Sequence, residues 1–471
     1  MMHMNKITMS LETSAKKPMY EQIYEYIKIE IQKGHMKPEE RLPSTRALAA
    51  HLQVSRSTVD LAYEQLLSEG YITSVPCKGY FVSKIEGLYD LKNSNLQIKE
   101  ENVSVPEKKE TEYLVDFKTT GIDLDSFPYN TWRKLSKSIL LDHEKELYTM
   151  GDAKGEWEFR VTISRYLHQS RGVDCEPEQI VVGAGSEYLL FLISQMLGKV
   201  SIAMESPTYK QAYQVMKSLH HPIVMVPMDK DGLKVDCLEQ SGARVAYVMP
   251  SHQFPLGIVM PLKRRIELLS WAAQEEGRYI IEDDYDSEFR YKGKPIPALQ
   301  GYDRNNKVIY LGTFSRSIAP AIRISYMVLP KSLLSSFRET CGVFSSTVSR
   351  IDQIIVNDFI TQGYFERHLN KMRAVYKAKH DCLIGALKCL QKVCDIEGEN
   401  AGVHMLLRMK QERSETEWIT LAEKEGIKVY GLSEYYISKD DIQDIKLILG
   451  YANLKEKDII TACNKLQKAW Q

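Results

Sequence analysis

The sequence predicts a multidomain α/β protein. We expect an N-terminal winged helix-turn-helix unit, a linker, and a large domain on a mostly parallel sheet with a smaller C-terminal subdomain. The 471 residues are too many for one ordinary domain. Two short helical patterns joined by a tight turn lie near the N-terminus. After residue 113, short apolar strands alternate with longer helical patterns, which is typical of α/β domains.

The composition is that of an ordinary globular protein. Apolar residues make up 44% and charged residues 26%, and the net charge is zero, so any basic surface has to be local. The first residues contain no continuous apolar signal segment, and no apolar run reaches the roughly 18 residues of a membrane span. The eight cysteines form no C-x-x-C pair, which favours free thiols in a reducing compartment. These features predict a cytoplasmic protein without membrane contact.

Residues 13–84 are predicted to form the winged helix-turn-helix unit. Isoleucines repeat every four residues over 23–31 until Gly34, which predicts a first helix. Two further helical patterns follow, separated by the tripeptide Gln-Val-Ser. Short apolar segments at 71–73 and 80–82 flank a turn, and they predict the hairpin of a wing.

The second and third helices carry the features of a DNA-binding surface. Between Arg41 and Val59 there are three arginines, a histidine, several hydroxyl residues and no acidic residue. Short polar side chains at a helix start suit entry into a major groove, and Arg56 can read guanine bidentately. The alternative is a solvated basic face on a protein-binding winged helix. The candidate DNA-binding residues are Ser44 and Ser55, which can also cap their helices, together with Arg46, Arg56, Ser57 and Thr58, and Lys78 and Gly79 at the wing tip.

This region resembles the winged helix of GntR-type bacterial regulators. The shared pattern appears here as LPSTRALAAHLQVSRSTVDLAYEQL, followed by EGYI and KGYFV. The resemblance covers nearly all of residues 18–84 and implies binding to a double-stranded DNA operator.

A linker is predicted at 85–112. From residue 92 to 112 the sequence has a few isolated aliphatic residues and no aromatic residue, which is too little apolar surface to fold. We therefore expect a flexible connection between the two folded parts.

The large domain is predicted over 113–471. Its expected strands lie at 180–182, 200–204, 245–249, 278–281, 308–311 and 324–329, with a further strand at 447–451 in the C-terminal subdomain. Ligands of parallel α/β sheets bind at the carboxyl ends of the strands. We therefore expect the site where these strands end.

Two strand ends suit a phosphate. Gly183-Ala-Gly-Ser-Glu187 joins a strand to an apolar helix, so its N–H groups and the Ser186 hydroxyl can hold an anion, although such a turn is more often merely a turn. The segment 308–326 passes from one apolar strand to another through small and hydroxyl residues, and it offers a second set of hydroxyls and N–H groups.

Three other strand ends suit an aromatic ring. Tyr209 follows a strand and can stack on a pyridine ring, with a core or rim position as the alternative. His252 and Gln253 are expected to offer hydrogen bonds near that ring. The run over 280–289 ends a buried strand in several carboxylates, one of which can hold a protonated pyridine nitrogen. Acidic clusters also suit Mg²⁺, but no Walker-type loop precedes this one, and no metal site is predicted.

Together these segments resemble the fold-type I aminotransferase domain, and more narrowly MocR-type regulators, which join a GntR winged helix to that domain. PSHQFPLGIVM, EDDYDSEFRY and TFSRSIAPAIRISYMVLP are close to family signatures. The resemblance implies a head-to-tail homodimer that senses pyridoxal 5′-phosphate (PLP) or an amine-containing ligand. It also implies cofactor contacts by Asp283 at the pyridine nitrogen, Tyr285 at the ring hydroxyl, Tyr209 on the ring face, and Ser186, Thr313, Ser315 and Arg323 around the phosphate.

Arg316 departs from this pattern, because the family carries the Schiff-base lysine there. A guanidinium stays protonated and offers no free amine. PLP binding is therefore expected to be non-covalent at most, and no catalytic residue is predicted. Arg316 can instead pair with a phosphate or a carboxylate of another anionic effector. The arginine that usually holds a substrate carboxylate is also missing, since the corresponding segment offers only Lys446.

The leading hypothesis is a dimeric transcription regulator that responds to a small-molecule effector. One alternative is a PLP-dependent aminotransferase with an accessory DNA-binding arm. Another is a large domain that serves only as a ligand-free dimerisation scaffold.

Overall fold

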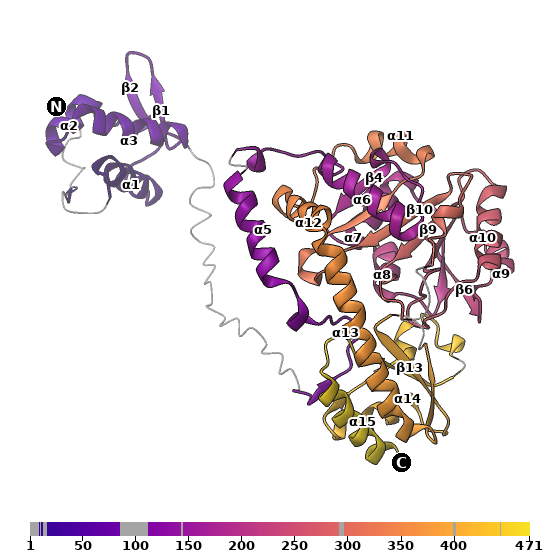
Figure 1. Ribbon diagram of the computed structural model, residues 1–471. Coiled ribbons are helices and arrows are strands. Elements are labelled where there is room, and N and C mark those ends of the chain that lie inside the picture. The colour runs from indigo at the N-terminus through magenta and orange to yellow at the C-terminus, as the bar shows by residue number, and fades with distance from the viewer. Residues whose placement is uncertain are drawn as a thin grey trace. The chain divides into compact units, whose positions relative to one another are not determined.

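The computed structural model describes residues 9, 11–12, 17–84, 112–142, 145–291, 296–398, 402–442 and 444–471. The chain divides into two compact units, Met1–Glu110 and Thr111–Gln471, each of which is described by itself (Figure 1). The predicted linker lies outside the described residues except for Glu112, as do 13–16 at the predicted start of the first domain. The predicted domain boundaries remain predictions.

The first unit is a three-helix bundle with a hairpin. Its core comes from one face of each helix and from both strands, and it includes Ile23, Ile27, Tyr63 and Val82. The hairpin strands are antiparallel, with Ile72 opposite Val82. The predicted winged helix-turn-helix is confirmed. Its elements are α1 (Met19–Gln32), α2 (Thr45–Leu52), α3 (Arg56–Ser68), β1 (Ile72–Val75) and β2 (Gly79–Val82).

The second unit contains an eight-stranded sheet, in the order β4-β11-β10-β9-β8-β5-β6-β7. Neighbours from β10 to β6 are parallel, while β11 is antiparallel to both its partners and β7 is antiparallel to β6. The predicted mostly parallel sheet is thus confirmed. The strands are β4 (Ile180–Gly183), β5 (Ile202–Ser206), β6 (Ile223–Asp229), β7 (Gly232–Leu233), β8 (Val245–Val248), β9 (Tyr279–Asp284), β10 (Val308–Thr313) and β11 (Ser325–Val328).

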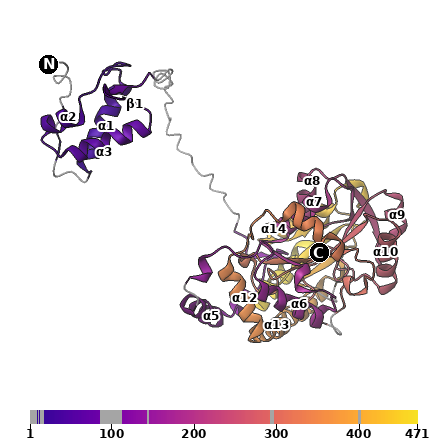
Figure 2. The same ribbon diagram turned by 90° about the horizontal axis from the view of Figure 1, so that it is seen from above.

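Helices cover both faces of this sheet (Figures 1 and 2). Successive side chains of a strand point to opposite faces, so Val181 packs with Leu189 of α7 while Val182 packs with Ile163 of α6. On the Val182 face, α10 covers the strands farther along the sheet. The helices of this part are α5 (Tyr129–Asp142), α6 (Trp157–Arg171), α7 (Ser186–Leu197), α8 (Lys210–Ser218), α9 (Val235–Gln240), α10 (Leu262–Gln274), α11 (Leu334–Ser336), a π-helix (Phe337–Cys341) and α12 (Arg350–Thr361).

The C-terminal subdomain is built on an antiparallel sheet of order β12-β13-β16-β15, with a separate parallel pair of β3 and β14. The predicted strand at 447–451 is β16, one residue earlier. The elements are β3 (Val115–Asp116), α13 (Tyr364–Leu387), β12 (Cys394–Glu397), β13 (His404–Met409), α14 (Glu415–Lys424), β14 (Ile427–Lys428), β15 (Tyr430–Gly431), β16 (Lys446–Gly450) and α15 (Glu456–Trp470).

Candidate functional site

The candidate DNA-binding surface lies at the starts of α2 and α3. Ser44 and Ser55 cap these helices, since their hydroxyls accept hydrogen bonds from the N–H groups of Ala47 and Thr58, each at 3.2 Å. The Ser55 hydroxyl also lies 2.8 Å from that of Ser57 and 2.7 Å from that of Thr58. Two of the predicted contact residues therefore also fix the first turn that would enter a groove.

The predicted cations of this unit are exposed. Arg56 is 70% exposed and pairs with Asp60 one turn on, at 3.4 Å. Arg46 lies on the exposed side of α2, and Lys78 is in the turn before Gly79, whose φ is +105°. Arg41 was not among the predicted residues, but its guanidinium lies beside Gly79. Because Arg41 precedes the second helix by several residues, its position beside the wing has no sequence signal.

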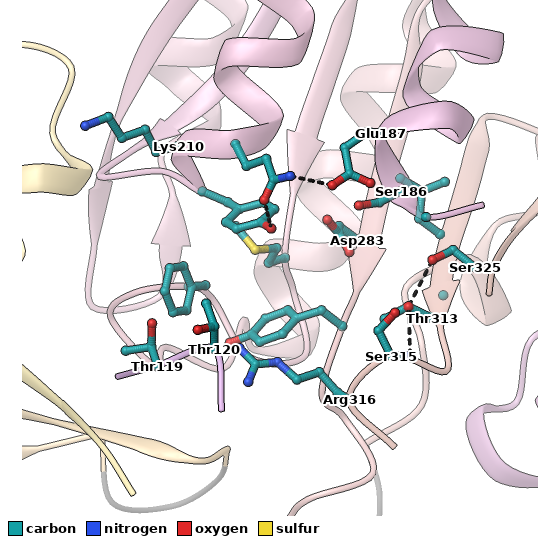
Figure 3. A pocket seen from close by; sticks show the side chains of 18 of the residues that line it. Thr119, Thr120, Ser186, Glu187, Lys210, Asp283, Thr313, Ser315, Arg316 and Ser325 are labelled. Atoms are coloured by element: carbon teal, nitrogen blue, oxygen red, sulfur yellow. Dashed lines mark hydrogen bonds between the residues drawn. The ribbon is translucent and has the colours of Figure 1, made fainter. Parts of the chain in front are cut away.

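A cavity of about 560 Å³ lies in the second unit, where β9 and β10 end and α7 begins (Figure 3). This volume is within the range of small-molecule sites. All eight residues predicted to contact a cofactor line the cavity: Ser186, Tyr209, Asp283, Tyr285, Thr313, Ser315, Arg316 and Arg323.

One end of the cavity is rich in hydroxyls. Thr313 and Ser325 are register partners on β10 and β11, and the Ser325 hydroxyl donates to that of Thr313 at 2.9 Å. The N–H of Ser315 donates to the same Thr313 oxygen at 3.1 Å. Opposite them, Ser186 begins α7 after Gly185 (Figure 3). Hydroxyls beside a helix N-terminus form an environment suited to a phosphate.

The backbone conformation at this end favours glycine at position 185, where the space is also crowded. Its φ is +96°, and a Cβ there would lie 2.1 Å from Nη2 of Arg323. Arg323 itself pairs with Glu187 at 2.7 Å, and it has a left-handed φ of +53°. The loop before β11 thus brings a cation against the start of α7.

Asp283 and Asp284 end β9 and point to opposite faces of the sheet. Asp283 is on the cavity side, where Tyr247 donates a hydrogen bond to it. Burial raises the pKa of Asp283 to about 6, and the hydrogen bond from Tyr247 works against that rise. Asp284 instead accepts from Arg171 at 2.8 Å and from Tyr310 at 2.6 Å. Only the first carboxylate is available to a ligand.

The chain matches two protein families and several known regulators. Residues 19–82 match the family "Bacterial regulatory proteins, gntR family", and residues 123–466 match "Aminotransferase class I and II". The chain is 39% identical over 469 residues to "Uncharacterized HTH-type transcriptional regulator YdeL" of Bacillus subtilis (strain 168), covering 99% of both chains. It is 31% identical over 479 residues to "Probable rhizopine catabolism regulatory protein MocR" of Rhizobium meliloti, covering 98% of this chain and 95% of that protein.

The chain belongs to the MocR-type group of GntR-family transcription regulators. Its large unit also resembles solved aminotransferases. The crystal structure of Pyrococcus horikoshii kynurenine aminotransferase aligns with a TM-score of 0.68 and 23% identity, covering 76% of this chain and 91% of that one. The likeness confirms the aminotransferase-like fold.

In this MocR-type chain, aromatic rings line the middle of the cavity. Tyr209 precedes α8, and its hydroxyl donates to Gln211 at 2.9 Å while its ring contacts Phe254 edge-on, with centroids 5.9 Å apart. The Tyr285 hydroxyl lies 3.0 Å from Nδ1 of His252. Burial raises the pKa of Tyr209 to about 12, so both phenols are neutral.

The prediction that His252 and Gln253 offer hydrogen bonds to a ring is wrong. Both are buried and absent from the cavity lining, which takes Phe254 from this loop instead. The Gln253 amide donates to the carbonyls of Pro207 and Phe254, at 3.0 and 2.9 Å. His252 Nδ1 lies 3.0 Å from Asp286, behind Tyr285. These side chains hold the loop and leave its aromatic residue to face the cavity.

Several lining residues had no sequence signal. Thr119 and Thr120 follow the first short strand of the unit, and Glu434 and Tyr435 come from the 3-10 turn after β15. They are more than 300 residues apart in sequence, so only the fold brings them together. Arg316 points toward this side of the cavity, away from Ser315 and Thr313 (Figure 3).

The part of the chain that the structure describes contains no helix long and apolar enough to cross a membrane.

Proposed function

We propose that this transcription regulator senses a phosphorylated pyridine ligand of the PLP type, bound without a covalent bond and without turnover. The observation that carries this proposal is the cavity itself, which is lined by the seven residues that the resemblance assigns to PLP and by Arg316 in place of the lysine after Ser315. The protein would recognise PLP by its ring and its phosphate.

The residues present fit such a ligand. The hydroxyls of Thr313, Ser315 and Ser325 and the start of α7 suit the phosphate. Asp283 suits the ring nitrogen, because a buried carboxylate held by Tyr247 is pre-oriented toward the cavity. Tyr209 offers a ring face, and Tyr285 offers a hydroxyl.

Covalent attachment requires an amine with a free lone pair, which Arg316 does not offer. Lys210 is the lysine among the lining residues that the structure describes, but it is exposed and its side chain extends away from the cavity (Figure 3). We therefore propose that the chain is not an aminotransferase. Reduction with borohydride in the presence of PLP should leave the chain mass unchanged, whereas Arg316→Lys should retain PLP covalently. A PLP adduct on the unaltered chain would contradict this part of the proposal.

We further propose the division into a DNA-binding domain at 13–84, a linker at 85–112 and an effector domain at 113–471. The DNA contacts would come from α2, α3 and the wing, in a cytoplasmic head-to-tail homodimer. A ligand changes promoter binding only if it binds two arrangements of the dimer with different affinity.

The test of DNA binding uses the full-length chain and double-stranded DNA from upstream of its own locus. We expect sequence-preferring binding whose logarithmic affinity falls linearly with the logarithm of salt concentration. Equal affinity for that DNA and for a scrambled duplex would contradict the proposed role of α3.

A further inference from the structure

We propose that Arg316 is a recognition residue for a carboxylate, so that the effector is a phosphorylated aromatic ring that also carries a carboxylate. This inference rests on the proposed function, since it uses the same cavity. It goes further by naming the group that the cavity recognises in place of the PLP aldehyde.

The positive charge of Arg316 has few interaction partners in the part of the chain that the structure describes. The interaction found for it among the described residues is one hydrogen bond, from Nη1 to the carbonyl of Gly121 at 3.3 Å. The other arginines near the site are paired, Arg171 with Asp284 at 2.8 Å and Arg323 with Glu187 at 2.7 Å. Glu434 also lines the cavity, but it is exposed and makes no ion pair with Arg316. A half-buried cation without a counterion favours binding of an anion.

Three titratable side chains near Arg316 are neutral near pH 7, those of Tyr285, Tyr435 and His404. Burial raises the pKa of Tyr285 and of Tyr435, with Arg316 acting in the opposite direction on both. Burial, with smaller contributions from His252 and Arg316, lowers the pKa of His404 to about 4. None of these side chains is anionic near pH 7, so the charge of Arg316 extends into the cavity.

The cavity therefore has two separate anion sites. The first is the hydroxyl end formed by Ser186, Thr313 and Ser325, where Arg323 is already engaged by Glu187. The second is at Arg316, on the side of Thr119 and Thr120 (Figure 3). A ring held at Asp283 lies between the two sites, so one ligand can span them with a phosphate at one end and a carboxylate at the other.

Neither Lys446 nor Lys210 offers its cation to the interior of this cavity. Lys446, the residue that the sequence offered, pairs with Glu397 at 2.7 Å and lines a different pocket. Lys210 is exposed and points outward (Figure 3). The planar guanidinium of Arg316 also suits the bidentate geometry of a carboxylate better than a lysine would.

The carboxylate has two possible sources, which the ligands must distinguish. It can be attached directly to the ring, as in 4-pyridoxic acid 5′-phosphate. It can also belong to an amino acid joined through a saturated amine, as in N-(5′-phosphopyridoxyl)-L-alanine. The matched ligand without the carboxylate is N-(5′-phosphopyridoxyl)ethylamine, which keeps the phosphate, the ring and the linking amine.

The experiment is calorimetric titration of the full-length chain with these three ligands and PLP. We expect at least one carboxylate ligand to bind about ten- to one-hundred-fold more tightly than the ethylamine compound, the range of a charge-assisted hydrogen bond. Arg316→Gln should remove this preference while leaving the affinity for the ethylamine compound nearly unchanged. Lys263→Gln, the control at an exposed cation of α10 away from the cavity, should keep the preference.

Each outcome separates this inference from the proposed function. Equal binding of all four ligands, with no effect of Arg316→Gln on the ratio, would overturn the carboxylate site and leave the ligand pocket intact. Failure of all four to bind a folded chain would overturn the proposed function itself. The ratio of the dissociation constants of two ligands for one variant is insensitive to a general loss of folded protein. Circular dichroism of each variant tests whether it is folded.

Discussion

Tyr247 on β8 donates a hydrogen bond to Asp283 on the neighbouring strand β9, at the base of the ligand cavity. Both side chains are buried. The bond stabilises the ionised carboxylate against the desolvation that raises the pKa of Asp283 to about 6. The charge that would hold a protonated ring nitrogen thus depends on a residue that is absent from the cavity lining.

Ligand affinity should fall with acidification because Asp283 loses its charge as the pH falls through about 6. Tyr247→Phe removes the hydrogen bond and raises the pKa of Asp283 further, so the fall should begin at higher pH. The measurement is the dissociation constant of N-(5′-phosphopyridoxyl)ethylamine between pH 5 and 8.

Two further variants control this experiment. Tyr310→Phe removes the corresponding bond to Asp284, which faces the other side of the sheet, and it should not move the profile. Asp283→Asn isolates the titration of the ligand phosphate, which also lies near pH 6. The same midpoint in the Tyr247→Phe and unaltered chains would contradict the role given to this pair.

Gly185→Ala should weaken ligand binding. The added Cβ would lie 2.1 Å from Arg323 Nη2, and the φ of +96° is one that alanine adopts only with strain. Gly198→Ala is the matched control, since it ends the same helix at a φ of +64° with nothing within 4 Å of the new Cβ. Calorimetry with inorganic phosphate and PLP should detect a loss of at least about ten-fold in the first variant only. A similar loss in both would show that strain alone, and not the phosphate end, is responsible.

Arg56→Ala should weaken specific DNA binding by about ten-fold or more, the effect of losing one bidentate base contact. Arg56 is exposed at the first turn of α3. Lys17→Ala, at an exposed cation paired with Glu25 on α1, is the control and should have a much smaller effect. Fluorescence anisotropy with operator and scrambled duplexes measures both. An equal loss on the two duplexes would reassign Arg56 to phosphate contact.

Glu205 should make the large unit less stable as the pH rises. It is 1% exposed on β5, and burial raises its pKa to about 8, although the Gln253 side chain and the backbone of Met249 act against that rise. The unfolded chain loses this proton near pH 4.3, so the free energy of unfolding falls between about pH 4.5 and 8 by a few kcal/mol. Glu205→Gln removes this slope.

Urea unfolding at pH 5, 6.5 and 8 measures the effect. At each higher pH, the free energy of unfolding of Glu205→Gln should increase relative to that of the unaltered chain. The difference between Glu158→Gln, at an exposed position of α6, and the unaltered chain should stay constant. A constant difference between the Glu205→Gln and unaltered chains across this range would mean that Glu205 is not held protonated.

Much of the site could be predicted because its residues lie in short motifs at strand ends. Asp283 and Thr313 lie at the ends of apolar strands and Gly185 follows one, and the sheet places such ends together. Thr119 and Tyr435 could not be predicted, since nothing local relates segments so far apart. The loop that contains His252 was predicted to line the cavity, but the side chain that faces the cavity is that of Phe254. The backbone of an irregular loop, and not its sequence spacing, decides which side chain faces the cavity.

Strands that are buried on both faces could be predicted from the sequence. The predicted strands at 245–249 and 308–311 correspond to β8 and β10, which differ from them by one or two residues at the C-terminal end. Strand β6 was not predicted, because it is half-buried and contains Pro227, which weakens a strand pattern. Strand β3 has two residues and pairs with β14, so its apolar run is too short to recognise.

The most direct test of the central claim is the affinity of the full-length chain for its upstream DNA, with and without saturating N-(5′-phosphopyridoxyl)-L-alanine. Linkage between ligand and DNA predicts a change of at least about five-fold in the dissociation constant, in either direction. The change should be absent in Gly185→Ala and present in Gly198→Ala. An unchanged DNA affinity at a ligand concentration that calorimetry shows to be saturating would contradict the account of a ligand-sensing regulator.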